Sequence, residues 1–536
     1  MSIEKGPVSK LSTYPSLELL SLIYLLLPHL LFCLGWLRLY VGLPMTLLWI
    51  WGSWCMFGKT QDGLPWHNKL PSSRILSSVL ILSLLLSICS GIGGLSYQRE
   101  DYQKHNLIYH DLLHQSWPVV DEDCNEEPYF LSYYLGYYLV AAGLASIVNP
   151  AGLEVCSFLW GWLGIALALL WICRLLPARP ILAMGLFICF GGLDVIENLF
   201  RAWDVGFFGT ALPYPMALTV DCQLPEQWGL GHNYPGHMSQ LGWAPQHAIS
   251  GWLAAAWCMH EILNRQCLKH VGFILALTLF WSPFIFLGLA GLVGIAVIKA
   301  GIRPAISWHN LLPPLLWVGI MAAYYGAHPP LAYNGFVWEY AAKPGWGVSL
   351  LYFGLGEFGI FGLLLLLLNK QNGGSKEDRF WMWAVLGLLT VILFYRIGRY
   401  NDVSLRVSGP PVLWMCILIG RSLTAIPRTS TLRLVLLVCL GIGSLVPLQE
   451  IVKNLAYPVV QMAPSLVEAI PPSLPGYVFI RHTLLREGAS YSSLTATNSI
   501  RDIEAPCEAG VHLPEDALFW QYVGKLDAWY YRVLSR

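Results

Sequence analysis

The sequence predicts an all-α polytopic membrane protein. Of its 536 residues, 56% are hydrophobic and only 12% are charged, whereas soluble domains carry about 25% charged residues. The mean hydropathy is +0.54. Several apolar runs also match the roughly 20 residues that a helix needs to cross the hydrocarbon core of a bilayer.

Charge and cysteine usage argue against a nucleic-acid-binding protein and against a structural metal site. The formal net charge is zero, and no cluster of Lys and Arg supplies the phosphate contacts of a nucleic-acid-binding protein, so we expect no nucleic-acid partner. The 13 cysteines form no CxxC pair and no Cys/His set with zinc spacing, which argues against a structural metal site. Three cysteines lie in long polar segments: Cys124, Cys222 and Cys507. Two of them could form a disulfide in an oxidising compartment, but the sequence does not show which pair.

Fourteen apolar runs follow one another along the chain. They are 17–37, 41–57, 74–95, 128–148, 152–175, 180–195, 244–263, 269–282, 284–299, 309–325, 346–369, 379–396, 409–424 and 431–449. The N-terminus leads into the first run without a small-residue cleavage site, so we expect this run to be retained as a span. Short basic connections favour the cytoplasm. If every run crossed, the connection with Arg174 and Arg179 would lie outside, so one run is expected not to cross.

The run at 128–148 is the one that we expect to lie at the membrane surface. Tyrosine favours the membrane–water interface, and five tyrosines crowd its first part: Tyr129, Tyr133, Tyr134, Tyr137 and Tyr138. An interfacial or re-entrant helix is therefore predicted here. About 13 spans remain, with a cytoplasmic N-terminus. The outer segments are then 96–151, 194–243, 326–345, 396–408 and the C-terminal tail.

These predictions divide the chain into four parts. Residues 1–95 hold the N-terminal transmembrane helices, 96–151 the first outer loop with the interfacial helix, and 152–449 the transmembrane core. Residues 450–536 are an outer-side tail or a small domain, because prolines and mixed polar sequence replace the apolar runs there. The aromatic C-terminal end predicts a further interfacial helix.

The first outer loop carries a candidate general base. The stretch NLIYHDLLHQ, with His110 and Asp111, predicts a short helix that ends before Trp117-Pro118. The low dielectric at a membrane rim raises the pKa of a carboxyl toward neutrality, which suits a general base. Asp111 is the candidate, and a loop hydrogen bond or a helix-stabilising role is the alternative.

The second outer loop begins and ends with further candidates. Asp194 and Glu197 are three residues apart, hence on one helical face, and could orient substrate hydroxyls or hold a divalent metal. His247 lies at the mouth of the run 244–263. A histidine is costly there unless it lines a cavity, so His247 is a candidate substrate-binding residue.

The segment YRIGRYNDVSLRVSGPP carries arginines on the predicted outer side, whereas basic residues usually lie on the cytoplasmic side of a membrane. A guanidinium group matches phosphate oxygens in bidentate geometry. Arg399 and Arg406 therefore predict a phosphate site. Pairing with Asp402 or with lipid head groups is the alternative.

The order of these elements resembles the GT-C superfamily of polytopic membrane glycosyltransferases, in an uncharacterised bacterial branch, over residues 75–425. By this resemblance Asp111 is the first-loop acid, Asp194 with Glu197 is the second acidic motif, and Arg399 or Arg406 is the phosphate clamp. The chain departs from the family in lacking the WWDxG-like sequence of oligosaccharyltransferases and in having two or three additional spans at the start. The acceptor is therefore left open.

The resemblance implies an inverting glycosyltransferase that moves a sugar from a polyprenyl-phosphate donor to a hydroxyl of a glycan, lipid or protein. Asp111 would be catalytic, and substrate would be bound by His110, Asp194, Glu197, His247, Arg399 and Arg406. A role for a divalent metal is open. The expected location is the bacterial inner membrane, with the reaction on its outer face.

Two other functions are alternatives. A membrane transporter or lipid-linked-sugar flippase predicts charges at mid-span and mirrored halves, whereas the charges of this chain lie at span ends. A non-catalytic scaffold for an envelope polysaccharide machine is the third interpretation.

Overall fold

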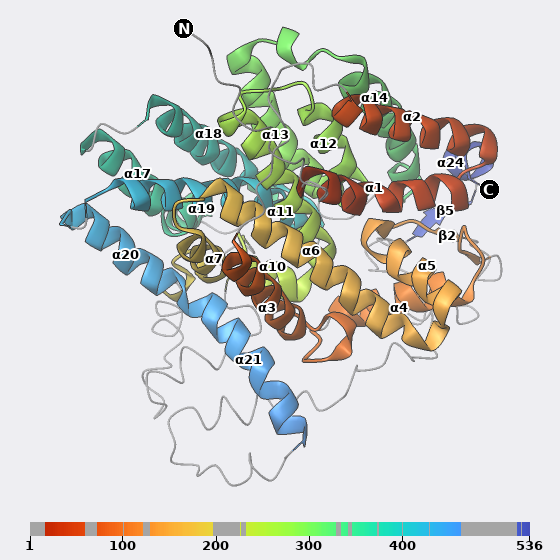
Figure 1. Cartoon of the computed structure of the whole chain (residues 1–536), viewed down its shortest axis with the longest axis horizontal. Helices are drawn as coiled ribbons and strands as arrows, with labels where there is room; N and C mark the ends of the chain where they lie inside the picture. Colours follow the sequence, from red (N-terminus) through yellow and green to blue (C-terminus); the bar gives the residue numbers. More distant parts are fainter. Residues whose placement is uncertain are drawn as a thin grey trace, which may run out of the picture.

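The computed structural model describes residues 17–58, 72–99, 101–121, 129–196, 226, 232–328, 334–340, 346–371, 375–398, 400–427, 429–462, 523–526 and 528–535. These residues are mostly helical (Figure 1). Within them, seven helical stretches are long and apolar enough to cross a membrane, so the protein is an α-helical membrane protein. The seven are Leu17–Gly35, Leu39–Phe57, Pro150–Leu175, Pro283–Ala300, Trp346–Gln371, Val403–Ala425 and Thr431–Leu455.

Most of the helices lie within the predicted apolar runs. In the first half of the chain they are α1 (Leu17–Gly35), α2 (Leu39–Gly58), α3 (Ser73–Cys89), α4 (Asp101–His114), α5 (Tyr138–Val148), α6 (Leu153–Leu175), α7 (Pro180–Cys189), α10 (His237–Trp243) and α11 (Pro245–Met259). In the second half they are α12 (Val271–Leu279), α13 (Pro283–Ala300), α14 (Trp308–Tyr325), α15 (Val337–Tyr340), α16 (Trp346–Gly354), α17 (Ile360–Gln371), α18 (Lys376–Ile392), α19 (Gly409–Ala425), α20 (Thr431–Gly443), α21 (Leu445–Met462) and α24 (Trp529–Val533). Turns of π-helix lie at His260–Asn264, Leu355–Gly359 and Val403–Val407.

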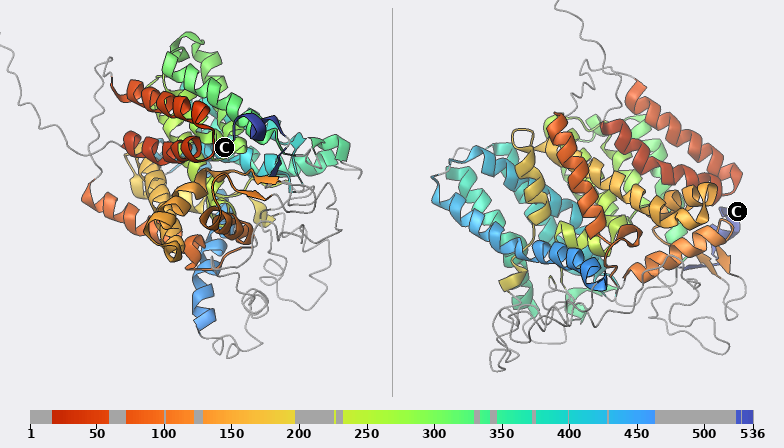
Figure 2. Two further views of the ribbon diagram at one scale, coloured as in Figure 1. Left: turned by 90° about the vertical axis from the view of Figure 1, so that its right-hand side faces the viewer. Right: turned by 60° about the horizontal axis from the view of Figure 1, so that its bottom comes forward.

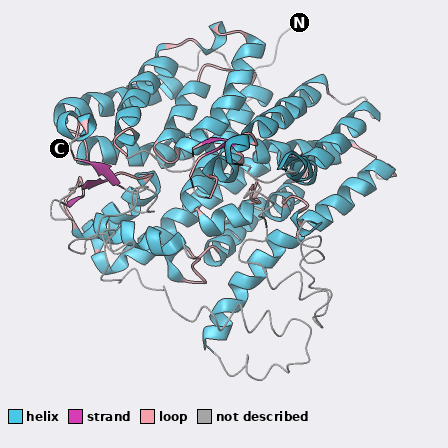
Figure 3. Ribbon diagram, turned by 180° about the vertical axis from the view of Figure 1, so that it is seen from behind, coloured by secondary structure: helices cyan, strands magenta, loops and turns pink. Residues whose placement is uncertain are grey.

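Two small sheets depart from a purely α-helical prediction (Figure 3). One contains β1 (Val120–Asp121), β2 (Tyr129–Leu131) and β5 (Val523–Lys525), and the other pairs β3 (Gly335–Phe336) with β4 (Tyr395–Arg396). All pairings are antiparallel. Each sheet contains a pairing between segments that lie far apart in the sequence, so its hydrogen bonds connect loops from different parts of the chain.

The run predicted as an interfacial helix begins as a strand instead. β2 takes up its first residues, and a 3-10 turn at Leu135–Tyr137 leads into α5. Because a helix rises about 1.5 Å per residue, the 11 residues of α5 span only about half of a hydrocarbon core. The hydrogen bonds of β2 with β5 take the place of a first helical turn.

The predicted run 180–195 also ends early, because α7 stops at Cys189. Phe190 is extended (φ −79°, ψ 121°), and two glycines follow it. A Cβ atom at Gly191 would lie 2.7 Å from the carbonyl oxygen of Gly443, and one at Gly192 would lie 2.1 Å from the Glu357 carboxylate. The close approach to α20 and to the π-helical turn Leu355–Gly359 therefore favours glycine at both positions.

Contacts link several of the connections that we predict to lie outside the membrane, together with the C-terminal segment. β5 pairs with β2, and the Lys525 amide donates to the carbonyl oxygen of Ala327 just after α14 (3.1 Å). The turn between α1 and α2 joins the same group, because the amide of Arg38 donates to the carbonyl oxygen of Leu534 (2.8 Å). Figures 1 and 2 show β5 and α24 against these elements at the side where the chain ends.

A second set of contacts links the connections that we predict to be cytoplasmic. Ion pairs join Arg174 to Glu18 (2.8 Å), Arg265 to Glu261 (2.9 Å), Arg421 to Asp378 (3.1 Å) and Lys299 to Glu377. The structure therefore collects the two predicted sets of connections separately.

Helix α11 lies at the centre of the bundle. All of its residues from Pro245 to Met259 are buried, and it packs against α6, α12 and α19. The indole of Trp414 on α19 donates to the carbonyl oxygen of Ala255 (3.0 Å). Gln246 and His247 lie in the first turn of this central helix, so their positions are set by packing on all sides.

Candidate functional site

An arginine–aspartate pair marks the candidate site. Arg406 lies in the π-helical turn before α19, and its Nη1 is 3.0 Å from Oδ1 of Asp402. The Arg406 side chain is 19% exposed, and its guanidinium carbon lies 5.6 Å from the ring centroid of Phe284. The cation is therefore mostly enclosed yet reachable by a ligand.

The backbone before Arg406 is shaped by two residues with positive φ. Gly398 has φ +73°, and Asn401 has φ +59°, a conformation that suits Gly and Asn best. A Cβ atom at Gly398 would lie 2.9 Å from Oδ2 of Asp402. The hydroxyl of Ser404 then fastens the turn by donating to the carbonyl oxygen of Asn233 (2.8 Å). The turn thus places Asp402 and Arg406 together.

Two tyrosines that follow β2 face this pair. The Tyr134 side chain is hydrogen-bonded to Arg406, and that of Tyr133 to Gln246. Burial raises the pKa of both phenols, while the positive charge of Arg406 acts in the opposite direction. The backbone of Tyr133 is held by the hydroxyl of Tyr324, which is 3.0 Å from its amide nitrogen and 3.1 Å from its carbonyl oxygen. Both phenols stay protonated and can serve as donors.

The first turn of α4 supplies a second carboxylate. Asp101 pairs with Lys104 at 3.2 Å, and its side chain is 31% exposed. Its charge favours a higher pKa for Asp402, and for His105 it opposes the lowering of the pKa by burial. For Asp402 this effect adds to the larger effect of burial, which also raises the pKa and which Arg406 opposes. The Asp101 carboxylate therefore belongs to the same electrostatic group as Arg406.

His105, one turn further along α4, is a fully bonded structural residue. Its Nε2 lies 3.2 Å from the carbonyl oxygen of Trp243, and its Nδ1 lies 2.5 Å from the hydroxyl of Tyr138. A carbonyl only accepts, so Nε2 carries the proton and Tyr138 donates to Nδ1. Burial lowers the pKa of His105 to about 4, so the ring is neutral near pH 7.

His247 approaches the group from α11. Its Nδ1 is 2.6 Å from the hydroxyl oxygen of Ser282, and its ring centroid is 5.1 Å from that of Tyr134. We call the set Asp101, Tyr133, Tyr134, His247, Asp402 and Arg406 the arginine site. It draws on four separate segments of the chain.

The structure brings two of the predicted site residues, His247 and Arg406, into the arginine site. Asp111 lies ten residues after Asp101 on α4, which is about 15 Å along the helix axis. It is buried, and its Oδ1 accepts from Nε2 of Gln115 (3.3 Å) and lies 3.4 Å from Nδ1 of His110. Both of these contacts are local along the chain. Glu197 and Arg399 lie outside the described residues.

Asp194 lies in a separate acidic group with Glu226. The amide of Gly236 donates to Oε1 of Glu226 at 3.0 Å. Burial, and then the Asp194 carboxylate, raise the pKa of Glu226 to about 8. Nearby, Arg99 forms a buried ion pair with Glu450, and its guanidinium carbon lies 4.8 Å from the ring centroid of Trp243.

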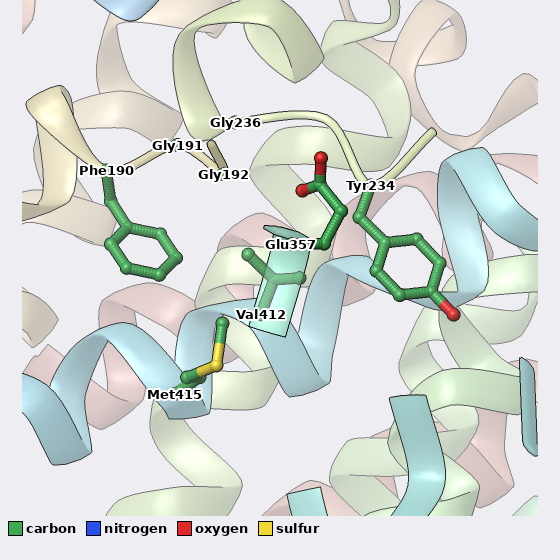
Figure 4. Close-up of a pocket in the computed structure, with 8 residues that line it drawn as sticks. All are labelled: Phe190, Gly191, Gly192, Tyr234, Gly236, Glu357, Val412 and Met415. Atoms are coloured by element: carbon green, nitrogen blue, oxygen red, sulfur yellow. The ribbon is translucent and has the colours of Figure 1, made fainter. Parts of the chain in front are cut away.

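A small pocket lies beside this acidic group (Figure 4). In Figure 4 the carboxylate of Glu357 points toward the backbone at Gly192 and Gly236, and the rings of Phe190 and Tyr234 flank it. Glu357 is buried within the π-helical turn Leu355–Gly359. In the part of the chain that the structure describes, no group of three or more His, Cys, Asp or Glu side chains could hold a metal ion.

Sequence reasoning missed Asp101 and assigned the two tyrosines only an interfacial role. The alternating Tyr and small or apolar residues of YFLSYYLGYY fit an interface and a site equally well. Asp101 follows Arg99 and Glu100 in the sequence, so this stretch reads as an ordinary charged helix start. Comparisons with family models, curated proteins and solved structures match nothing.

Proposed function

We propose that this protein is a membrane glycosyltransferase of the GT-C type, which transfers a sugar from a polyprenyl-phosphate donor to an acceptor hydroxyl with inversion. The observation that carries the proposal is the mostly enclosed Arg406 among tyrosine and carboxylate side chains. A fixed cation stabilises the charge that develops on a departing phosphate. The surrounding apolar helices suit the polyprenyl chain.

The proposed topology has about 13 spans, a cytoplasmic N-terminus and an outer C-terminal tail, in a bacterial inner membrane. The arginine site is proposed to face the outside. In support of this, Tyr133 and Tyr134 come shortly after β2, which pairs with β5 near the α1–α2 turn, and all these segments are predicted to lie on the outer side. The opposite set of connections contains the ion pairs of Arg174, Arg265 and Arg421, as the positive-inside bias expects.

The reaction assigns one role to each charged group. The acceptor oxygen attacks the anomeric carbon and forms the new glycosidic bond, while the bond from that carbon to the phosphate oxygen breaks. The phosphate leaves with the bonding electron pair, and Arg406 stabilises its charge. Asp101 takes the acceptor proton, because its carboxylate is accessible and belongs to the same electrostatic group as Arg406.

A lipid-linked-sugar flippase is the second candidate. The observation that favours it is Glu357, a buried carboxylate in a π-helical turn of a stretch that is apolar enough to cross a membrane. Ionisable residues at such positions commonly serve transport or proton movement. The arginine site would then bind the phosphate without transferring the sugar.

The test is transfer of radiolabelled sugar from polyprenyl-phosphate donors in membranes that contain the protein. We expect Arg406→Ala and Asp101→Asn each to lower the rate by about 100-fold or more. Asp111→Asn decides between the two α4 carboxylates, and Arg303→Ala at an exposed position is the control. Loss of transfer in Asp111→Asn with full activity in Asp101→Asn would return the base to Asp111. Transport of the lipid without sugar transfer would favour the flippase.

A further inference from the structure

His247 has a buried ring nitrogen without a partner among the described residues. The side chain is 3% exposed, and Nε2 makes no hydrogen bond. A buried polar atom left unpaired costs about 1–3 kcal/mol. Such atoms in folded proteins usually mark the position of a ligand or an ordered water.

The other ring nitrogen determines where the proton is. Nδ1 lies 2.6 Å from the hydroxyl oxygen of Ser282, and that oxygen already accepts from the amide of Ile285 (3.1 Å) as the N-cap of α13. No other acceptor among the described residues contacts this hydroxyl, so we assign its proton to the hydrogen bond with Nδ1. Nδ1 is therefore unprotonated, and Nε2 of the neutral ring carries the hydrogen. The unpaired atom is a donor.

This donor lies next to the fixed cation of the site. Tyr134 contacts both groups, since its side chain is hydrogen-bonded to Arg406 and its ring centroid is 5.1 Å from that of His247. Arg406 is also among the charges that act on His247. The Tyr134 side chain therefore links the His247 ring, on the central helix α11, to the fixed cation of Arg406.

We propose that Nε2–H of His247 donates a hydrogen bond to an oxygen of a phosphate group held by Arg406. This inference rests on the proposed function, which it extends by naming a second contact of the phosphate. His247 acts as a binding residue and takes no proton in the reaction. Ser282 is the positioning residue, because its hydroxyl selects the tautomer that presents the donor.

A pair of amide substitutions tests this assignment. Asn places its amide near the position of Nδ1 and keeps a contact with Ser282, whereas Gln places its amide nitrogen near the position of Nε2. We expect His247→Asn to weaken binding of polyprenyl phosphate by about 10- to 100-fold, as for loss of a hydrogen bond to a charged group. His247→Gln should stay within a few-fold of wild type.

Binding is measured on the full-length protein in lipid nanodiscs, with thermal unfolding of each variant as the control for folding. Inorganic phosphate and phosphatidylglycerol distinguish a free anion or a bulk-lipid head group from the polyprenyl phosphate. Polyprenol, which lacks the phosphate, should bind equally to wild type and to both variants.

Three outcomes overturn the inference. Full affinity in His247→Asn would mean that Nε2–H holds only water, and equal loss in both variants would assign His247 a packing role. Wild-type affinity for polyprenyl phosphate no better than for polyprenol would remove the phosphate from the site. A fourth outcome separates the two proposals. If polyprenyl phosphate binding depends on Nε2–H of His247 but the protein transfers no sugar, the inference is supported and only the proposed transfer is overturned.

Discussion

Arg406 and Asp402 form an ion pair across one turn of π-helix, with Nη1 and Oδ1 3.0 Å apart. Each side chain is less than one-fifth exposed. Desolvation therefore opposes the charge on both groups, and each stabilises the other. The pair keeps a cation in place within an apolar bundle.

Removing Arg406 should destabilise the protein through the carboxylate left behind. We expect Arg406→Ala to lower the free energy of unfolding by about 1–3 kcal/mol, because the buried Asp402 charge loses its partner. Adding Asp402→Asn to this variant should recover part of the loss, since the amide is neutral. Thermal unfolding in detergent measures both effects. A double variant that is less stable than Arg406→Ala would contradict the assigned pairing.

The C-terminal strand should depend on a glycine. A Cβ atom at Gly524 would lie 2.5 Å from the ring of Phe130 in β2 and 3.2 Å from Cβ of Ala327. We expect Gly524→Ala to loosen β5, at about 1–3 kcal/mol for overpacking, and to speed trypsin cleavage after Lys525. Gly319→Ala is the matched control, because a Cβ atom there meets nothing within 4 Å. Equal cleavage of the two variants would show that β5 does not depend on this contact.

Glu226 should make stability fall as pH rises. Its pKa of about 8 exceeds the ordinary 4.5, so the folded state binds more protons than the unfolded state between these values. By linkage, the contribution of Glu226 is fully present below about pH 4.5 and is lost as pH rises through 8.

We therefore expect Glu226→Gln, which stays uncharged, to be more stable relative to wild type at pH 9 than at pH 5. Melting temperatures across this range provide the measurement. Glu339→Gln, at an exposed position, is the control. A constant difference between Glu226→Gln and wild type at all pH values would contradict the raised pKa.

The orientation in the membrane can be tested with two exposed lysines. Lys525 lies in β5 on the face of the arginine site, and Lys376 begins α18 beside the contacts of the opposite face. In a cysteine-free background, a membrane-impermeant maleimide should label Lys525→Cys in intact cells. Lys376→Cys should react only after the membrane is permeabilised. The reverse pattern would place the arginine site in the cytoplasm.

The helical class and the positions of most helices follow from the sequence alone. Backbone groups in lipid must bond internally, so long apolar runs become helices wherever they occur. The boundaries of α6, α13 and α19 lie within a few residues of the predicted runs. Local composition cannot show where a helix meets another backbone, which is why the break at Gly191 and Gly192 appears only in three dimensions.

The sequence by itself also determined that Arg406 and His247 are exceptional, because a cation on the presumed outer side and a histidine at the mouth of an apolar run each demand a reason. Only the tertiary structure decided which acid joins them. Asp101 and Asp111 share α4, and it is the charge of Asp101, in the first turn, that acts on Asp402 and Arg406. The tautomer of His247 likewise depends on Ser282, 35 residues away. Such contacts arise from the packing of separate helices, and no local pattern encodes them.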